Sequence, residues 1–570
     1  MFRLYQFLIA FVVFVGLASA AQSRPLSAPT PVQAVIARNG MVVAQEARAA
    51  RIGANILKRG GNAVDAAVAV GFTMAVTYPR AGNIGGGGFM VIHLAKGNQD
   101  IAIDYRETAP AAAAKTMFLN DKGNPDPAKS RDSAIGIGVP GTVAGLALAH
   151  RQYGSGTFSL AELMAPAIEY ARNGVPIEDD TADSLPAARE RLARWPASTR
   201  IFFKNGAPLA PGDTLVQSDL ADTLQAIASQ GPRGFYEGPV AAKIADAIHA
   251  AGGIVTTDDL KHYHAILRVP VRGTYRGYDI VSMPPPSSGG VHLIEMLNIL
   301  EGYDLAKLGR NDEALHDTIE AMKRAYADRA IFMGDPEAVR MPIKGLLSKK
   351  YAASLRDTIG EKATPAADIR AGKPQNFEGP NTTHFSIIDH DGNAVSNTYT
   401  LNFSYGLGMV ADGTGVLLNN ELDDFTAKAG ASNAYGLVGF DANLPGPGKH
   451  PLSSMTPTIV LKDGKPFLVT GSPGGSRIIT TVLQVIMNVI DFHMSIADAV
   501  TAPRLHHQWQ PDEVLVEPDF PQATLDALKA RGDKITPVAP GTSANSIEVT
   551  PQGYVGAADT RTRGALAAGY

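Results

Sequence analysis

The 570-residue sequence contains no cysteine. A disulfide framework, a thiolate nucleophile and a cysteine-based metal site are therefore excluded. The chain also lacks a basic excess, because 51 lysines and arginines are balanced by 55 aspartates and glutamates, and this argues against nucleic-acid binding. Beyond the first residues, no apolar run reaches the roughly 18 residues of a membrane-spanning helix, so we expect no membrane span in the mature protein.

Two common hydrolase motifs are missing as well. Neither a G-x-S-x-G nucleophile elbow nor an H-E-x-x-H zinc motif occurs. The pair His506-His507 and the HYH run at 262–264 contain residue types that bind metals. Because neither has a spaced carboxylate partner, we expect surface or core histidines at both places.

The first residues, MFRLYQFLIAFVVFVGLASAAQ, have the pattern of a secretory signal peptide. Arg3 precedes an apolar run that is too short to span a bilayer, and Ala18-Ser19-Ala20 supplies a small-residue cleavage signal. The alternative is an uncleaved anchor. We expect a signal peptide over residues 1–20 and export to the periplasm of a Gram-negative-type bacterium.

The first half of the mature chain reads as helices mixed with buried strands. The spacing predicts a helix from Ala44 to Arg59, and Asn62 is placed to cap a second helix. The apolar run Phe89 to Leu94 predicts a buried strand with IAIDYR as its partner. For the preceding glycines, Gly85 to Gly88, we favour close backbone packing over a phosphate loop, because the order of strand, glycines and helix is not met.

The second half changes to a strand pattern at Thr382. Asp391-Gly392 and Asp463-Gly464 are hairpin signals between apolar runs. A long apolar helix is predicted after Gly474-Gly475, and Ser495 is placed to cap another. Two hairpins and packed helices predict an α+β fold in which helices cover an antiparallel sheet.

Thr382 and Thr383 stand between a polar loop and a strand, which is where self-cleavage would be accessible. A threonine hydroxyl becomes a good nucleophile when the residue's own α-amino group acts as base, and that group is free only if the chain is cut just before it. Gly474 and Gly475 at a strand end could form an oxyanion hole. The residues alone leave Thr382 and Thr383 undecided, and an ordinary strand start remains the alternative.

Together these motifs resemble the gamma-glutamyltransferases (gamma-glutamyl transpeptidases). The resemblance is carried, in family order, by RGGNAVDAAVA, DYRETAP, VPGTVAGL, MPPPSSGG, NTTHFSIID, TYTLNFSYG, LLNNELDDF, PLSSMTPTIV, GSPGGSRI and GAADTRTRGALAAGY. It implies a four-layer αββα N-terminal-nucleophile hydrolase that cuts itself between Asn381 and Thr382. The expected products are a large subunit, residues 21–381, and a small subunit, residues 382–570, which form one heterodimer.

The same resemblance implies roles for individual residues. Thr382 matches the nucleophile, Thr400 the threonine that orients it, and Gly474 and Gly475 the oxyanion hole. The implied substrate contacts are Arg106, Ser453 and Ser454 for the α-carboxylate, Asn402, Glu421 and Asp424 around the α-ammonium group, and Tyr435 on a lid loop. From the residues alone, Arg106 would be a surface ion-pair residue, Glu421, Asp423 and Asp424 a solvated acidic turn, and Ser453-Ser454 turn or cap residues.

The implied activity is cleavage of γ-glutamyl amide bonds, as in glutathione, and transfer of the γ-glutamyl group to water, amino acids or dipeptides. No metal or organic cofactor is expected. Two alternatives stay open: a cephalosporin or glutaryl acylase on the same scaffold, and a non-enzymatic exported protein that binds small acidic peptides.

Overall fold

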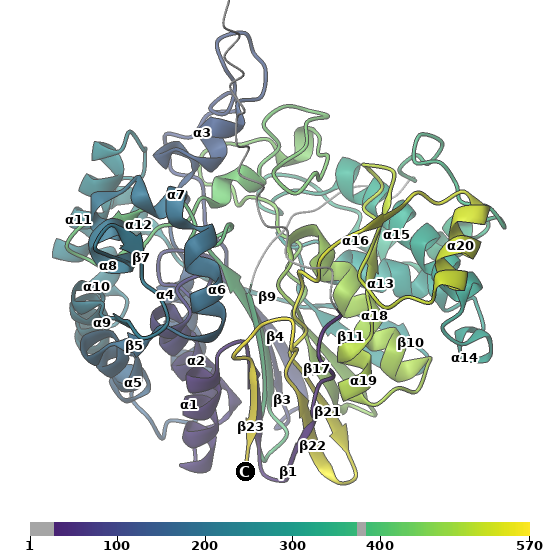
Figure 1. Cartoon of the computed structure of the whole chain (residues 1–570), viewed down its shortest axis with the longest axis horizontal. Coiled ribbons are helices and arrows are strands. Elements are labelled where there is room, and N and C mark those ends of the chain that lie inside the picture. Colours follow the sequence, from purple (N-terminus) through teal and green to yellow (C-terminus); the bar gives the residue numbers. More distant parts are fainter. Residues whose placement is uncertain (1–27, 373–382) are drawn as a thin grey trace, which may run out of the picture.

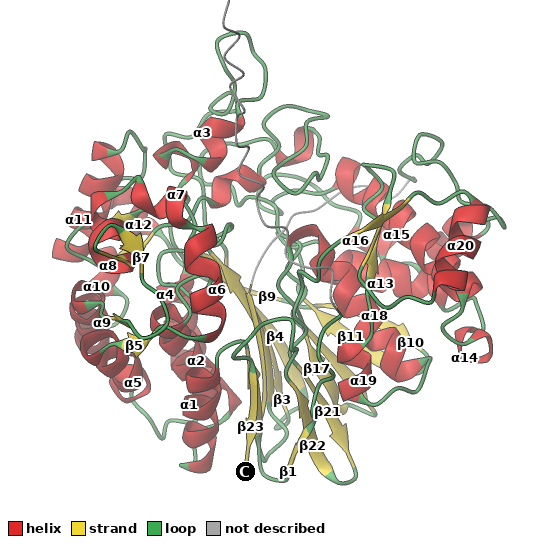
Figure 2. Ribbon diagram, viewed as in Figure 1, coloured by secondary structure: helices red, strands yellow, loops and turns green. Residues whose placement is uncertain are grey.

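The computed structural model describes residues 28–372 and 383–570. Two seven-stranded sheets pack face to face at its centre, and helices cover the outer face of each, so the chain forms four layers in the order α, β, β, α (Figures 1 and 2). Every strand pairing within these two sheets is antiparallel. This confirms the predicted α+β sandwich.

We name the sheets after strands that reach the site. The β12 sheet runs in the order β23 (Leu566–Gly569), β2 (Met41–Ala44), β12 (Thr383–Ile388), β13 (Ala394–Thr400), β3 (Gly87–Leu94), β4 (Gln99–Tyr105) and β9 (Ile266–Arg268). The β17 sheet runs in the order β1 (Val35–Ala37), β22 (Gly553–Ala557), β21 (Ser546–Thr550), β17 (Lys465–Thr470), β16 (Thr458–Lys462), β11 (Tyr278–Ser282) and β10 (Val271–Tyr275). Each sheet takes strands from both sides of residues 373–382, so the two parts of the chain build one unit.

Strand β3 shows how the layers are held together. Successive side chains of a strand point to opposite faces, and here Phe89 and Val91 enter the core between the sheets while Met90 and Ile92 enter the core under the helices. All four are fully buried. A strand that is covered on both faces reads as a continuous apolar run, which is why this segment was recognised in the sequence.

The helices form two separate layers. The β12 sheet is covered mainly by α1 (Ala47–Lys58), α2 (Ala63–Thr77), α4 (Thr142–Tyr153), α5 (Leu160–Asn173), α9 (Ser218–Gln230), α10 (Arg233–Tyr236) and α11 (Gly238–Ala250). The β17 sheet is covered mainly by α13 (Gly289–Leu300), α15 (Asp312–Phe332), α17 (Lys349–Arg356), α18 (Ile478–Ile490) and α19 (Ile496–Thr501). Across residues 28–372 and 383–570, no helix combines the length and apolarity needed to cross a bilayer.

Local predictions hold with small shifts. Asn62 caps α2 in a capping box with Asp65, as expected. Helix α1 begins at Ala47 rather than Ala44, because Ala44 is the last residue of β2 and Glu46 caps the helix. Close packing explains the glycines before β3: a Cβ on Gly88 would lie 2.4 Å from the Cβ of Tyr399 in the neighbouring strand. The expected signal peptide, residues 1–20, lies outside the described residues.

Candidate active site

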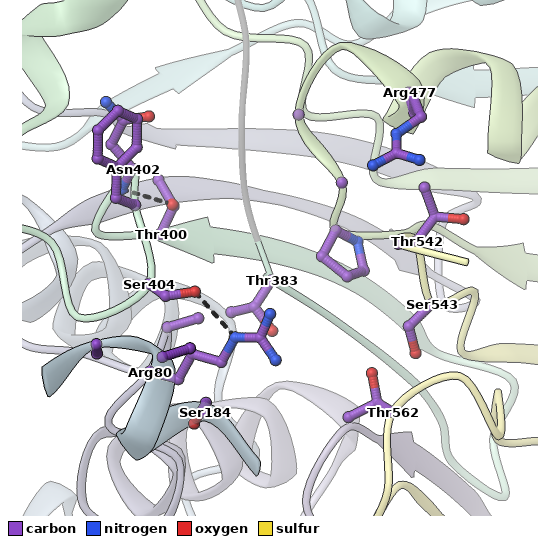
Figure 3. A pocket seen from close by; sticks show the side chains of 18 of the residues that line it. Arg80, Ser184, Thr383, Thr400, Asn402, Ser404, Arg477, Thr542, Ser543 and Thr562 are labelled. Atoms are coloured by element: carbon purple, nitrogen blue, oxygen red, sulfur yellow. Dashed lines mark hydrogen bonds between the residues drawn. The ribbon is translucent and has the colours of Figure 1, made fainter. Parts of the chain in front are cut away.

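A cleft of about 1370 Å³ opens where the strands of both sheets end. Predicted site residues line it from several elements: Thr400 and Asn402 at the end of β13, Gly474 and Gly475 after β17, and Tyr435 from a long loop (Figure 3). Thr382 itself lies outside the described residues. Thr383, the next residue and the first of β12, also lines the cleft.

The hydroxyl of Thr383 already has a partner. It donates a hydrogen bond to Gln45 Oε1, and that oxygen also accepts the backbone N–H of His384 at 3.3 Å. The amide nitrogen of Gln45 in turn donates to Thr562 Oγ1 at 3.2 Å. The sequence analysis missed Gln45, whose one local signal is its place directly after β2. A hydroxyl engaged in this way serves to hold the start of β12 in position.

Gly474 and Gly475 form a turn that other residues could not adopt. Their φ angles are 133° and 65°, in the region that favours glycine, and a Cβ on Gly474 would lie 2.5 Å from Thr542 Cγ2. A short 3₁₀ turn, Gly475–Arg477, leads from them into α18. Backbone N–H groups at the start of a helix favour negative charge, so this turn suits an oxyanion.

Thr400, Asn402 and Tyr435 are linked by hydrogen bonds on the opposite wall. Thr400 Oγ1 accepts the backbone N–H of Asn402 at 2.8 Å, so its own proton can still be donated into the cleft. Tyr435 Oη donates to Asn402 Oδ1 at 3.0 Å. The segment around Tyr435 is loop, as the sequence predicted, and this contact ties it to the cleft wall.

Arg106 lies in a buried cluster beside the cleft and does not line it. Its guanidinium donates to Glu421 and, at 2.7 Å, to Asp424 Oδ2, and all three side chains are fully buried. The expectations of a surface ion pair at Arg106 and a solvated acidic turn at 421–424 are therefore wrong. The physical reason is that the acidic side chains sit within the fold, where Arg106 compensates the burial of Glu421 and Asp424, and Arg131 pairs with Asp423 at 3.2 Å.

Ser453 and Ser454 adjoin this cluster. Arg106 donates to the carbonyl oxygens of Pro451 and Leu452 at 3.0 and 3.4 Å, which places the PLSS stretch against it. The cluster also reaches the cleft wall, since Asn402 Nδ2 donates to the carbonyl of Asn420, the residue before Glu421, at 2.9 Å. The structure thus brings the predicted residues into two adjoining groups, one lining the cleft and one buried next to it.

Carboxyl groups outnumber cations in the buried cluster. Burial raises the pKa of Glu421 and of Asp424 well above the usual range, although Arg106 opposes the shift. Burial likewise raises the pKa of the neighbouring Glu107 to about 8. Both oxygens of Glu107 and Oε2 of Glu421 are buried without a hydrogen-bond partner among the described residues. Such a cluster can accept a further cationic group, such as an ammonium ion.

A Glu107→Gln substitution is expected to flatten the pH dependence of stability. The folded protein binds the Glu107 proton more tightly than the unfolded chain, whose value is near 4.5. This stabilisation is complete below about pH 4.5 and is lost as the pH rises through about 8. Because one pKa unit corresponds to about 1.4 kcal/mol, wild type should lose roughly 2 kcal/mol or more relative to the variant between pH 5 and 9.

Urea unfolding at pH 5, 7 and 9 measures this effect. The matched control is Glu169→Gln, which replaces an exposed glutamate on α5 and should follow wild type at every pH. Parallel pH curves for wild type and Glu107→Gln would contradict the electrostatic description of the cluster.

The four histidines considered as metal ligands lie either in the core, in contact with other side chains, or on the exposed surface. His506 is buried and contacts Thr480 and Gln508, and His507 is buried with a contact to Asp512. His262 and His264 are exposed. His506 and His507 are thus core positions, and His262 and His264 are surface positions.

The double sheet and its glycine-lined cleft define an enzyme of the N-terminal-nucleophile hydrolase class. The gamma-glutamyltranspeptidase family model matches residues 49–569. The chain is 52% identical over 540 residues to the glutathione hydrolase proenzyme of Escherichia coli (strain K12), covering 94% of this chain and 93% of that protein. The chain belongs to the gamma-glutamyltranspeptidase family.

Solved structures agree with this assignment. A cephalosporin acylase from Bacillus halodurans superposes with a TM-score of 0.85 at 29% identity, covering 98% of this chain and 99% of that chain. A gamma-glutamyltranspeptidase from Helicobacter pylori superposes with a TM-score of 0.56 at 48% identity, covering 58% of this chain and 95% of that chain. The fold is therefore shared by family members whose names give different activities.

Proposed function

We propose that this protein is a self-cleaving enzyme that hydrolyses γ-glutamyl amide bonds, as in glutathione, and transfers the γ-glutamyl group to amines. One observation carries the proposal: Thr383, the residue after Thr382, begins β12 inside a cleft that it shares with Thr400, Asn402, Gly474 and Gly475. Cutting the Asn381–Thr382 bond would give subunits of residues 21–381 and 382–570. The word proenzyme in the name of the E. coli relative supports this order of events.

Maturation and catalysis use one hydroxyl. Thr382 Oγ attacks the carbonyl carbon of Asn381, and the resulting ester is opened by water. The freed α-amino group, with an ordinary pKa of about 7.7–8.0, is then a suitable base at neutral pH. It takes the proton of Thr382 Oγ as that oxygen attacks the γ-carbonyl carbon of the substrate. The N–H groups of Gly474 and Gly475 stabilise the oxyanion, and Thr400 orients the nucleophile.

The second half of the reaction resolves the acyl-enzyme. The leaving amine takes a proton from the Thr382 amino group as the first amide bond breaks. Water or an amine then attacks the γ-glutamyl ester and restores the free threonine. Besides water and the acceptor amine, these steps use side chains, backbone groups and the Thr382 amino group of this chain.

The buried cluster supports selection for a free α-amino acid end. Arg106 has the planar fork that suits an α-carboxylate, with Ser453 and Ser454 beside it, and to present this fork to a substrate it would have to release Glu421 and Asp424. Glu421 and Asp424, in an environment already rich in carboxyl groups, suit the α-ammonium group. A glutaryl side chain lacks that ammonium group, which argues against the acylase alternative despite the similarity to the B. halodurans acylase.

A direct comparison of γ-glutamyl-p-nitroanilide with glutaryl-p-nitroanilide tests this proposal. The two substrates differ only in the α-amino group. We expect kcat/KM to favour the γ-glutamyl compound by at least about 100-fold, since its α-ammonium group can pair with the buried carboxyl groups and the glutaryl compound has no such group. Equal or reversed values would favour the acylase, and no release of nitroaniline from either would favour a binding protein.

We also propose that the protein is exported. The signal-peptide pattern of residues 1–20 supports the periplasm as the site of action. The interleaving of strands from both sides of residues 373–382 supports a heterodimer in which the two subunits stay together after cleavage.

A further inference from the structure

Two arginines flank Ser404 on the cleft wall next to Asn402. Arg80 donates through Nε to Ser404 Oγ at 3.0 Å, and Arg191 donates through a terminal nitrogen to the Ser404 carbonyl at 3.1 Å. All three residues line the cleft, and Figure 3 shows Arg80 joined to Ser404 on the same side of the view as Asn402. The reaction described so far does not use either arginine.

Arg80 is held rigidly but keeps one donor group available. One terminal nitrogen donates to Asp180 at 2.6 Å and Nε is bound to Ser404, whereas the second terminal nitrogen has no partner among the described residues. The backbone carbonyl of Arg80 also accepts the N–H of Tyr405 at 2.8 Å. The side chain is 37% exposed, so this nitrogen is open to a ligand in the cleft.

Arg191 contributes a positive charge without a carboxylate partner in the described parts of the chain. It donates to the carbonyls of Ser404 and Gly406, and its guanidinium lies 4.8 Å from the centre of the Phe403 ring. Two acidic residues on this wall are paired elsewhere, Asp132 with Arg194 at 3.0 Å and Asp183 with Arg563 at 2.8 Å. Glu190 also lines the cleft, and its side chain is exposed, where solvent screens its charge. The surface around Ser404 therefore favours an anion.

We propose that Arg80 and Arg191 form a subsite for the carboxylate of the peptide that leaves or accepts the γ-glutamyl group. The inference rests on the proposed function. In transfer, the acceptor's amine nitrogen bonds to the γ-carbonyl carbon, the ester bond to Thr382 Oγ breaks, and one amine proton passes to that oxygen. A carboxylate at the far end of a dipeptide acceptor would then meet the arginine donors, as would the carboxylate of the leaving peptide of glutathione.

Transfer to glycylglycine and to glycylglycinamide tests the subsite, with γ-glutamyl-p-nitroanilide as donor for both. The two acceptors differ in the terminal carboxylate. Wild type should prefer glycylglycine, and Arg80→Gln and Arg191→Gln should each lower the ratio of the two kcat/KM values about tenfold through the acceptor KM. Arg80→Lys, which keeps the charge, should retain part of the preference. Arg194→Gln, which alters a cleft arginine already paired with Asp132, is the control and should keep the wild-type ratio.

The outcomes separate this inference from the proposed function. The proposed subsite is contradicted if wild type shows equal kcat/KM for the two acceptors. It is also contradicted if both glutamine variants lower kcat/KM for the two acceptors by the same factor. If wild type releases no nitroaniline at all, the proposed function has failed. Arg80→Gln leaves Asp180 buried without its cation, so this variant could fail to fold or mature. In that case the ratio of kcat/KM values for glycylglycine and glycylglycinamide measured on Arg191→Gln decides the test.

Discussion

Replacing Thr382 by alanine should leave the precursor as one chain and lower turnover of a γ-glutamyl anilide by at least about 10⁴-fold. In the proposed mechanism the same oxygen attacks the Asn381 carbonyl during maturation and the substrate afterwards, so its removal should stop both steps. The Thr382 amino group, the proposed base, would also never be released. Gel analysis and nitroaniline release measure the two losses on the same sample.

Two further variants make this result specific. Thr382→Ser keeps a hydroxyl and should still be cut and turn over substrate, at lower rates. Thr383→Ala removes the hydroxyl that is bonded to Gln45, and this variant should still be cut and active. Cleavage of Thr382→Ala, combined with loss of cleavage in Thr383→Ala, would exchange the roles of the two threonines.

Replacing Arg106 by glutamine should have the next largest effect. Its guanidinium is the cation bound to Glu421 and Asp424, and breaking a buried ion pair from one side costs about 3–5 kcal/mol of unfolding free energy. If Arg106 binds the α-carboxylate as proposed, the variant should also lose at least about 100-fold in kcat/KM for γ-glutamyl donors, because that carboxylate loses its forked donor. Urea unfolding and steady-state kinetics give the two numbers separately.

Arg106→Lys distinguishes charge from shape. Lysine keeps the positive charge but has no planar fork, so stability should recover more than kcat/KM does. Arg172→Gln is the matched control, because Arg172 forms a surface pair with Asp222 and its loss should change stability by about 1 kcal/mol or less. An Arg106→Gln variant as stable and active as wild type would contradict the proposed role of this residue in substrate binding.

Local signals predicted much of the secondary structure. The capping box of Asn62 and Asp65 involves only four consecutive residues, and the turn at Asp463-Gly464 depends on two residues with positive φ. Both signals depend on the backbone nearby, so the sequence contains them directly. The composition of β3, apolar on both faces, likewise follows from its place between two cores.

Contacts between residues far apart in the sequence could not be predicted from local signals. Arg106 and Glu421 are 315 residues apart, so nothing local to the arginine shows that it is buried or that an acidic turn joins it. Gln45 and Thr383 are 338 residues apart, and their hydrogen bond depends on the pairing of β2 with β12. The resemblance to a family supplied the roles of residues that chemistry alone would have placed on the surface.

Intact mass measurement of the purified protein tests the central proposal most directly, before and after reaction with an electrophilic glutamate analogue. Two fragments are expected, and the smaller should begin at Thr382 and gain the mass of the adduct on that residue. Active protein that consists of a single uncut chain, or an adduct on any other side chain, would contradict it.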